Sequence, residues 1–163
     1  MTTPSSPAQP LTLRSRYVSL REWLGHFPMS ILQLGLRVGV GLVFFNAGIL
    51  KYQSFEFAVK LFQDEYKVPL LDPAVAARMA TFNELTFPVL LFLGLASRLA
   101  TLPLLGQLLV MEYTYPHAWN DHVFWGCTLL FILTRGPGVF SLDYLIERYF
   151  ASGRSWPSAA LTS

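Results

Sequence analysis

The amino-acid sequence predicts an all-α protein, a four-transmembrane-helix bundle with short amphipathic interfacial helices. Two observations predict this fold class. First, 53% of the 163 residues are hydrophobic and only 13% are charged, whereas about a quarter of the residues in a soluble protein are charged. Second, the apolar residues gather in four runs nearly free of charge, and each can be extended to the roughly 20 residues that span a hydrocarbon core; the runs are 31–50, 85–96, 99–111 and 123–134.

The first part of the chain is polar and basic. Residues 1–10 are rich in Ser, Thr and Pro and are expected to form a disordered tail. Residues 11–27 carry several arginines and can lie on the membrane, with Trp23 and Phe27 at the interface. Residues 1–28 are therefore interpreted as a cytoplasmic basic N-terminal segment, and residues 151–163 as a disordered C-terminal tail.

The positions of Lys and Arg around the spans predict the orientation of the chain. The four spans are expected at about 30–52, 73–95, 98–115 and 121–135. By the positive-inside rule, the side richer in Lys and Arg is cytoplasmic, so both termini are expected in the cytoplasm. The residues on that side are Arg14, Arg16, Arg21, Arg98, Arg135, Arg148 and Arg154, and those on the other side are Lys60, Lys67 and Arg78.

Two shorter amphipathic helices are predicted outside the spans. One lies in the long loop between the first two spans and ends at Val68 and Pro69. The other follows the turn at 136–138, where Ser141 can cap its first turn. Their apolar stripes consist, in the same order, of Phe55, Ala58, Leu61 and Phe62, and of Leu142, Leu145, Ile146 and Tyr149.

Charge and cysteine content exclude several classes of function. The formal net charge of +2 is too small to indicate a nucleic-acid partner. Because Cys127 is the single cysteine, an internal disulfide, a CxxC redox pair and a cysteine-rich metal cluster are impossible. Cys127 lies in an apolar run and is expected to pack in the core.

Ionisable side chains inside the spans are the first candidates for a functional site, because each costs a few kcal/mol in a membrane and normally faces the bundle interior. Arg37 is the expected partner of Glu84, and Lys51 can pair with Glu112 in the outer half. Such pairs either only hold the bundle together or line a pocket that binds a quinone-like or anionic ligand or carries protons. No catalytic residue is assigned; the candidate polar interior consists of Arg37, Lys51, Glu84, Arg98 and Glu112.

The first span also carries two glycines on its polar face. Gly41 and Gly48 lie at helical spacing with Arg37 and Lys51. Small residues at such a spacing allow a neighbouring helix to approach closely. We therefore expect this face to pack against another span.

A loop between the last two spans contains the residues best suited to a metal ion. Imidazole and carboxylate can bind copper or zinc, and the weak candidates here are His117, Asp121 and His122. Their spacing matches no strong metal motif, and tyrosine, tryptophan and histidine at a membrane boundary are typical of an aromatic belt. No metal site is therefore expected, and the belt interpretation is preferred.

The chain resembles the DoxX family of small bacterial membrane proteins. The resemblance covers about residues 34–149 and rests on the segments FFNAGILK at 44–51, GLASRLA at 94–100 and GPG at 136–138, the last followed by SLD at 141–143. It implies a four-helix inner-membrane domain over residues 29–150. The family includes the small subunit of thiosulfate:quinone oxidoreductase, so the resemblance also implies a link to quinone chemistry.

The function expected from these features is that of an accessory or quinone-interacting subunit of a redox or stress-response system in the bacterial plasma membrane. If it takes part in an enzyme, it does so at most as a subunit of a quinone-linked oxidoreductase; no cofactor is assigned, and quinone is the candidate. The expected partners are the lipid bilayer and a redox enzyme or further copies of the chain, with no nucleic acid. Two alternatives stay open: an oligomeric permease for small solutes or ions, and a non-catalytic membrane scaffold.

Overall fold

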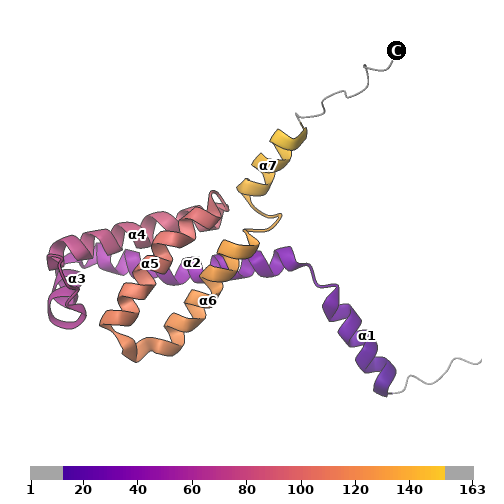
Figure 1. Ribbon diagram of the computed structural model, residues 1–163, viewed down its shortest axis with the longest axis horizontal. Coiled ribbons are helices and arrows are strands. Elements are labelled where there is room, and N and C mark those ends of the chain that lie inside the picture. The colour runs from indigo at the N-terminus through magenta and orange to yellow at the C-terminus, as the bar shows by residue number, and fades with distance from the viewer. Residues whose placement is uncertain (1–12, 153–163) are drawn as a thin grey trace, which may run out of the picture.

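The computed structural model is an all-α fold, as the sequence predicts, and it describes residues 13–152 (Figure 1). The predicted tail at 1–10 and all but the start of the predicted tail at 151–163 lie outside the described residues. The helices are α1 (Leu13–Gly25), α2 (Met29–Gln53), α3 (Phe55–Leu61), the π-helical turn η1 (Phe62–Tyr66), α4 (Pro73–Leu93), α5 (Ser97–Thr114), the 3₁₀ turn η2 (Pro116–Ala118), α6 (Trp119–Arg135) and α7 (Leu142–Ser152).

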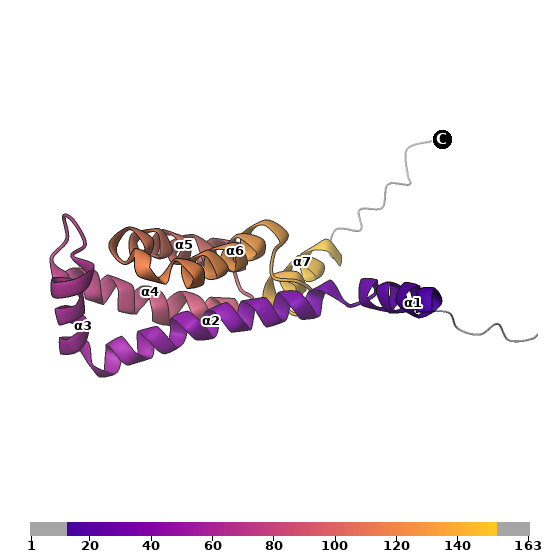
Figure 2. The same ribbon diagram turned by 90° about the horizontal axis from the view of Figure 1, so that it is seen from below.

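Four long helices form a bundle of two layers. Figure 2 shows α2 and α4 side by side in one layer and α5 and α6 in the other. Each helix of the bundle packs against two others, because α2 and α5 both contact α4 and α6. The fully buried large aliphatic side chains of the central core come from α4, α5 and α6: Leu91, Leu104, Leu129 and Ile132.

The ends of the predicted spans agree with the observed helices to within about two residues, and local chemistry explains them. The Asp72 carboxylate accepts hydrogen bonds from the backbone N–H groups of Ala74 and Val75, and Pro73 occupies the first helical position of α4. Gly94, with a φ of 66°, ends the same helix in the left-handed conformation.

Among the described helices, α2 is the one whose length and composition suffice for crossing a membrane. Two of the others carry charges that lower their hydropathy: Arg78 and Glu84 in α4, and Arg98 and Glu112 in α5. The remaining helix of the bundle, α6, has 17 residues, against roughly 20 for a full span. The four long helices and their bundle are therefore observed, whereas four membrane crossings are a proposal taken up below.

The glycine face of α2 packs against α4, as predicted. A Cβ atom at Gly48 would lie 2.9 Å from Cβ of Glu84 and 3.0 Å from its carbonyl carbon. A Cβ atom at Gly41 would lie 2.6 Å from the ring of Phe92. These contacts leave room for hydrogen alone, so the two glycines fix how closely and in which register α2 and α4 meet.

One end of the bundle is covered by α3 and η1, which form the predicted amphipathic helix (Figure 1). Ala58 and Phe62 are buried on its inner side, and Phe62 joins a small apolar cluster with Ala77 of α4. The helix ends at Lys67, which has a φ of 42°, one residue before the predicted stop. The cluster holds this segment over the space between α4 and α5.

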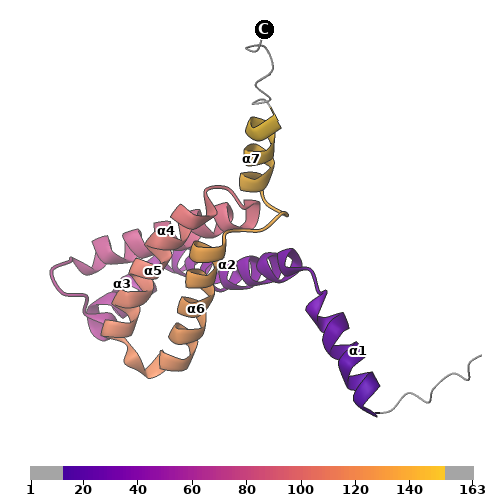
Figure 3. The ribbon, with the colours of Figure 1, turned by 45° about the vertical axis from the view of Figure 1, so that its right-hand side comes forward.

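At the opposite end, α1 and α7 extend away from the bundle (Figure 3). Ser141 caps α7 as predicted, because its hydroxyl accepts a hydrogen bond from the Tyr144 N–H over 3.2 Å. The Asp143 carboxylate accepts hydrogen bonds from the N–H groups of Ala96 and Ser97 over 2.6 and 2.9 Å. This bond pair caps α5 and ties α7 to the turn between α4 and α5.

The prediction that Cys127 packs in the core is wrong. Cys127 is exposed on α6, whereas Thr128 and Leu129 beside it are buried. The run from 123 to 134 is apolar on both faces, so its composition alone does not reveal which face turns inward.

We predict that Gly48→Ala destabilises the bundle and that the matched variant Gly39→Ala does not. The added methyl group at position 48 collides with the α4 backbone, which costs about 1–3 kcal/mol. Gly39 lies on the same helix with nothing within 4 Å of a Cβ atom, so alanine there only gains helix propensity, up to about 1 kcal/mol. Thermal unfolding of both variants in the same detergent measures the difference. Equal stabilities of the two variants would contradict the close α2–α4 contact.

Candidate functional site: a buried ion pair beside an apolar cavity

The central polar feature of the bundle is an ion pair between Lys51 of α2 and Glu84 of α4. The Lys51 ammonium nitrogen lies 2.8 Å from each oxygen of the Glu84 carboxylate. The Glu84 side chain is 1% exposed and the Lys51 side chain 16% exposed. Gly48, one turn before Lys51, lets α2 lie directly against Glu84. Because both charges are removed from water, the loss of either one would leave the other buried without compensation.

The prediction that Arg37 pairs with Glu84 is wrong. The two terminal nitrogens of Arg37 donate hydrogen bonds to the carbonyl oxygens of Pro137 and Phe140, over 2.9 and 2.6 Å. Arg37 precedes Lys51 by 14 residues, a separation of about 21 Å along a helix axis. The prediction counts the depth of each residue from the end of its own span, and such a count does not determine the register between two helices. The contact of Gly48 with Glu84 sets that register and leaves Arg37 at the other end of the bundle.

The prediction that Lys51 pairs with Glu112 is also wrong. A carboxylate oxygen of Glu112 lies 2.6 Å from Nδ1 of His122, and Lys51 is already engaged by Glu84. The His122 side chain is 4% exposed and that of Glu112 27%. His122 also packs against the Trp125 ring at 5.7 Å. His122 is therefore an interior residue that links α6 to α5.

Two amides extend the ion pair into a network between α4 and α5. Nε2 of Gln107 donates to the Glu84 carboxylate over 2.6 Å. Nδ2 of Asn83 donates to Oε1 of Gln107 over 2.8 Å and to the carbonyl oxygen of Pro103 over 3.0 Å. Gln107 is absent from the residues singled out by sequence. Its one signal is a polar side chain in an otherwise apolar run, and its partner becomes known only when α4 and α5 are placed together.

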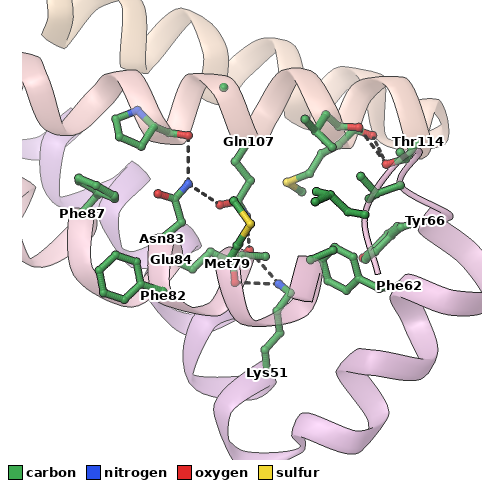
Figure 4. Close-up of a pocket in the computed structure, with 18 residues that line it drawn as sticks. Lys51, Phe62, Tyr66, Met79, Phe82, Asn83, Glu84, Phe87, Gln107 and Thr114 are labelled. Carbon is green, nitrogen blue, oxygen red and sulfur yellow. Dashed lines mark hydrogen bonds and ion pairs between the residues drawn. The ribbon is translucent and has the colours of Figure 1, made fainter. Parts of the chain in front are cut away.

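A cavity of about 490 Å³ lies against this network, between α4, α5 and η1 (Figure 4). Its volume is in the range of small-molecule sites, which combine apolar walls with a few convergent polar groups. Three of its lining residues, Met79, Phe82 and Val110, are exposed on the bundle surface, so the cavity opens between α4 and α5. The polar wall consists of Lys51, Glu84, Asn83 and Gln107, and the apolar wall includes Phe62, Met79, Phe82, Phe87, Val110 and Met111.

A second cavity of about 260 Å³ lies on the other side of the ion pair, among α2, α3 and α6. Lys51, Glu84, Tyr66 and Met111 line both cavities. Burial raises the pKa of the Tyr66 phenol, and the carboxylates of Glu65 and Glu84 raise it further. The phenol therefore stays protonated at neutral pH. Among the described residues it has no hydrogen-bond partner, so it can donate to a molecule in either cavity.

The other candidate site residues lie apart from this network. Arg98 is exposed at the start of α5, at the end of the bundle that also holds Arg37. His117 is exposed and its ring lies 5.6 Å from that of Tyr115. Within residues 13–152 no three His, Cys, Asp or Glu side chains are grouped to hold a metal ion, so His117, Asp121 and His122 do not form one cluster.

Comparison with known proteins assigns the chain to a family. The sequence profile of the DoxX family matches residues 32–116, which is 85 of the 163 residues. The chain belongs to the DoxX family. A protein of Haemophilus influenzae, named only as uncharacterized, is 29% identical over 133 aligned residues, which cover 74% of this chain and 86% of that protein. No solved structure gives a significant match.

The region matched by the DoxX profile contains the ion pair, the two amides and the cavity of about 490 Å³. It runs from α2 to the end of α5, and every residue that lines the larger cavity lies inside it. The profile match stops at residue 116, before α6. The DoxX part of this chain therefore carries Lys51, Glu84 and Gln107 together with the cavity they face.

We predict that Lys51→Met and Glu84→Gln each destabilise the protein strongly and that the double variant recovers much of the loss. Removing one partner of a buried pair leaves the other uncompensated, at a cost of about 3–5 kcal/mol. Arg37→Met combined with Glu84→Gln serves as the control and should give additive losses, because the two residues share no contact. Thermal unfolding in detergent gives the coupling energies. Additive losses for Lys51 and Glu84 would contradict their pairing.

Proposed function

We propose that this DoxX protein is a four-span integral membrane protein that binds a quinone-like ring in the cavity between α4 and α5. In this role it serves as the quinone-interacting subunit of a redox or stress-response system. The observation that carries the proposal is the cavity itself: an apolar space that opens on the bundle surface and has a charged, hydrogen-bonding wall at its inner end.

The distribution of side chains supports membrane insertion of all four long helices. Large hydrophobic side chains are exposed on every one of them, whereas Glu84, Arg37 and Gln33 are buried. Exposed apolar surface of this extent is unfavourable in water. A lipid bilayer, in contrast, stabilises a bundle whose apolar side chains face outward and whose polar side chains face inward. The exposed apolar side chains include Leu42 and Leu50 of α2, Met79 and Phe82 of α4, Leu102 and Leu109 of α5, and Phe124 and Leu130 of α6.

The proposed orientation places α1 and α7 in the cytoplasm. Arg98 and Arg135 lie at the α1 and α7 end of the bundle, with Arg14, Arg16 and Arg21 in α1. The opposite end holds α3, η1 and the loop before α6. The positive-inside rule then assigns the arginine-rich end to the cytoplasm.

The chemistry of the cavity fits a flat apolar ring with carbonyl oxygens. Phe62, Phe82 and Phe87 offer aromatic contacts. At the polar wall, the Lys51 ammonium group has three N–H donors, and the carboxylate of Glu84 accepts two of them. The third donor and the Tyr66 hydroxyl are available to carbonyl oxygens of a ligand. A ligand dissolved in the membrane reaches the cavity sideways, past Met79 and Val110.

A ring bound in this way needs a second protein for redox chemistry. The proposal therefore includes a redox-enzyme partner that supplies or removes electrons while this subunit holds the ring. At one end of the bundle α1 and α7 extend away from the four long helices (Figure 3), and we propose that the partner binds there.

We predict that Gly106→Leu weakens binding of a short-tailed benzoquinone by about tenfold or more, because the new side chain fills the cavity. Gly106 lines the cavity and has nothing within 4 Å of a Cβ atom, so leucine enters without a backbone clash. The matched control is Gly39→Leu, which adds the same side chain at an open position outside the cavity. Calorimetric titration of the purified proteins in detergent measures the affinities.

The outcomes of this titration are distinct. Tight binding by the native chain and by Gly39→Leu, with loss in Gly106→Leu, supports the cavity as the quinone site. Equal binding by all three proteins overturns it, since the ring must then bind elsewhere. Absence of binding to the native chain, together with flux of a small solute through liposomes that contain it, would favour a permease instead.

The proposed orientation makes a separate prediction. In a Cys127→Ala background, a cysteine at Ser54 should react with a membrane-impermeant thiol reagent in intact cells. A cysteine at Ser19 should react only after lysis. Both positions are exposed, at the start of α3 and in α1 respectively. Labelling of the Ser19→Cys protein in intact cells would reverse the orientation.

A further inference from the structure

A cavity of about 520 Å³ lies at the arginine-rich end of the bundle, separate from the site above. It is formed where the turn between α4 and α5, the end of α6 and the start of α7 meet. Its lining includes the charged residues Arg98, Arg135, Asp143 and Glu147 and the polar residues Ser30, Gln33 and Tyr144. It shares no residue with either of the cavities beside Lys51 and Glu84.

Two arginines of this cavity have no partner for their guanidinium groups among the described residues. Arg98 is the second residue of α5. Its guanidinium lies against Gly136, since a Cβ atom at Gly136 would be 3.3 Å from Nη2 of Arg98. Arg135 directly precedes that glycine in the chain and is the last residue of α6. Neither side chain takes part in a hydrogen bond or an ion pair within residues 13–152. Two cations are thus brought to one cavity without an ion-pair partner among the described residues.

The acidic residues of the cavity do not neutralise these arginines. The Asp143 carboxylate is occupied by the N–H groups of Ala96 and Ser97, and it also interacts electrostatically with the buried Arg37. Glu147 is exposed on α7 and has no ion pair within the described residues. Glu147 lines the same cavity, so its negative charge opposes the binding of an anion there.

We propose that this cavity binds the phosphate group of an anionic phospholipid headgroup through Arg98 and Arg135. Guanidinium groups bind phosphate oxygens through paired charge-assisted hydrogen bonds. The hydroxyl groups of Ser30 and Tyr144 can donate to the same group. Leu99 and Val139, which also line the cavity and are exposed, provide apolar surface for the glycerol and the first part of the acyl chains.

The choice of a lipid over a free phosphate rests on the membrane placement proposed above. Arg98 and Arg135 lie at the cytoplasmic ends of α5 and α6, which is the level of the lipid phosphates in a four-span arrangement. The lipid headgroup would fill the cavity between the bundle and α7. It would thereby stabilise the position of α7 together with the hydrogen bonds of Asp143.

Native mass spectrometry of the full chain in a non-ionic detergent tests this site. The probes are dioctanoyl phosphatidylglycerol, dioctanoyl phosphatidylcholine and inorganic phosphate. We expect preferential binding of phosphatidylglycerol, weakened by about tenfold in Arg98→Gln and in Arg135→Gln, because each loses a charge-assisted contact. Glu147→Gln should strengthen binding. Arg21→Gln, which removes an exposed arginine of α1 outside the cavity, is the matched control and should leave binding unchanged.

Three outcomes would overturn the proposal. Equal loss of binding in Arg21→Gln would show general attraction of lipid to positive charge. Equal binding of phosphatidylcholine would remove the requirement for an anionic headgroup, and binding of inorganic phosphate as tight as that of phosphatidylglycerol would assign the site to a free anion. Gly106→Leu, the variant that blocks the quinone cavity, should bind phosphatidylglycerol normally. Failure at one site is therefore separable from failure at the other.

Discussion

The structure depends on one constraint: the Glu84 carboxylate is buried in a bundle whose exterior is apolar, so it must find its compensation inside. Lys51 supplies the opposite charge and Gln107 a further hydrogen bond. Both reach the carboxylate because Gly48 lets α2 lie directly on α4. The same requirement places a polar wall next to apolar aromatic side chains, and that combination makes the cavity suitable for a small ring.

At the opposite end of the bundle, charged side chains form hydrogen bonds with backbone groups near the helix ends. Arg37 donates to two carbonyl oxygens of the segment after α6, and Asp143 accepts from the first N–H groups of α5. Gly94 makes these contacts feasible, because a Cβ atom there would lie 2.7 Å from Nη1 of Arg37. Because Asp143 binds backbone groups, it does not pair with Arg98 or Arg135, which line the cavity at this end of the bundle. The bundle therefore has a cavity beside the buried ion pair at one end and a charged junction at the other.

The sequence by itself determined the helices and several of their ends. Apolar runs separated by polar segments set the four long helices, since their periodicity and length depend on local composition alone. Helical spacing of apolar residues also identified α3 and α7, and the cap at Ser141 followed from residue type. The close-packing role of Gly41 and Gly48 was equally visible, because a glycine pair on a polar face has few other uses within a span.

Only the tertiary structure decided which charges meet. Counting depth along each predicted span pairs Arg37 with Glu84, but the contact at Gly48 sets a different register between α2 and α4 and brings Lys51 to Glu84 instead. The inward face of α6, which leaves Cys127 exposed, likewise depends on packing. The cavity could not be derived from sequence at all, because its walls come from residues far apart in the chain. Register and cavity shape are properties of contacts between helices, whereas a sequence pattern reports on one helix at a time.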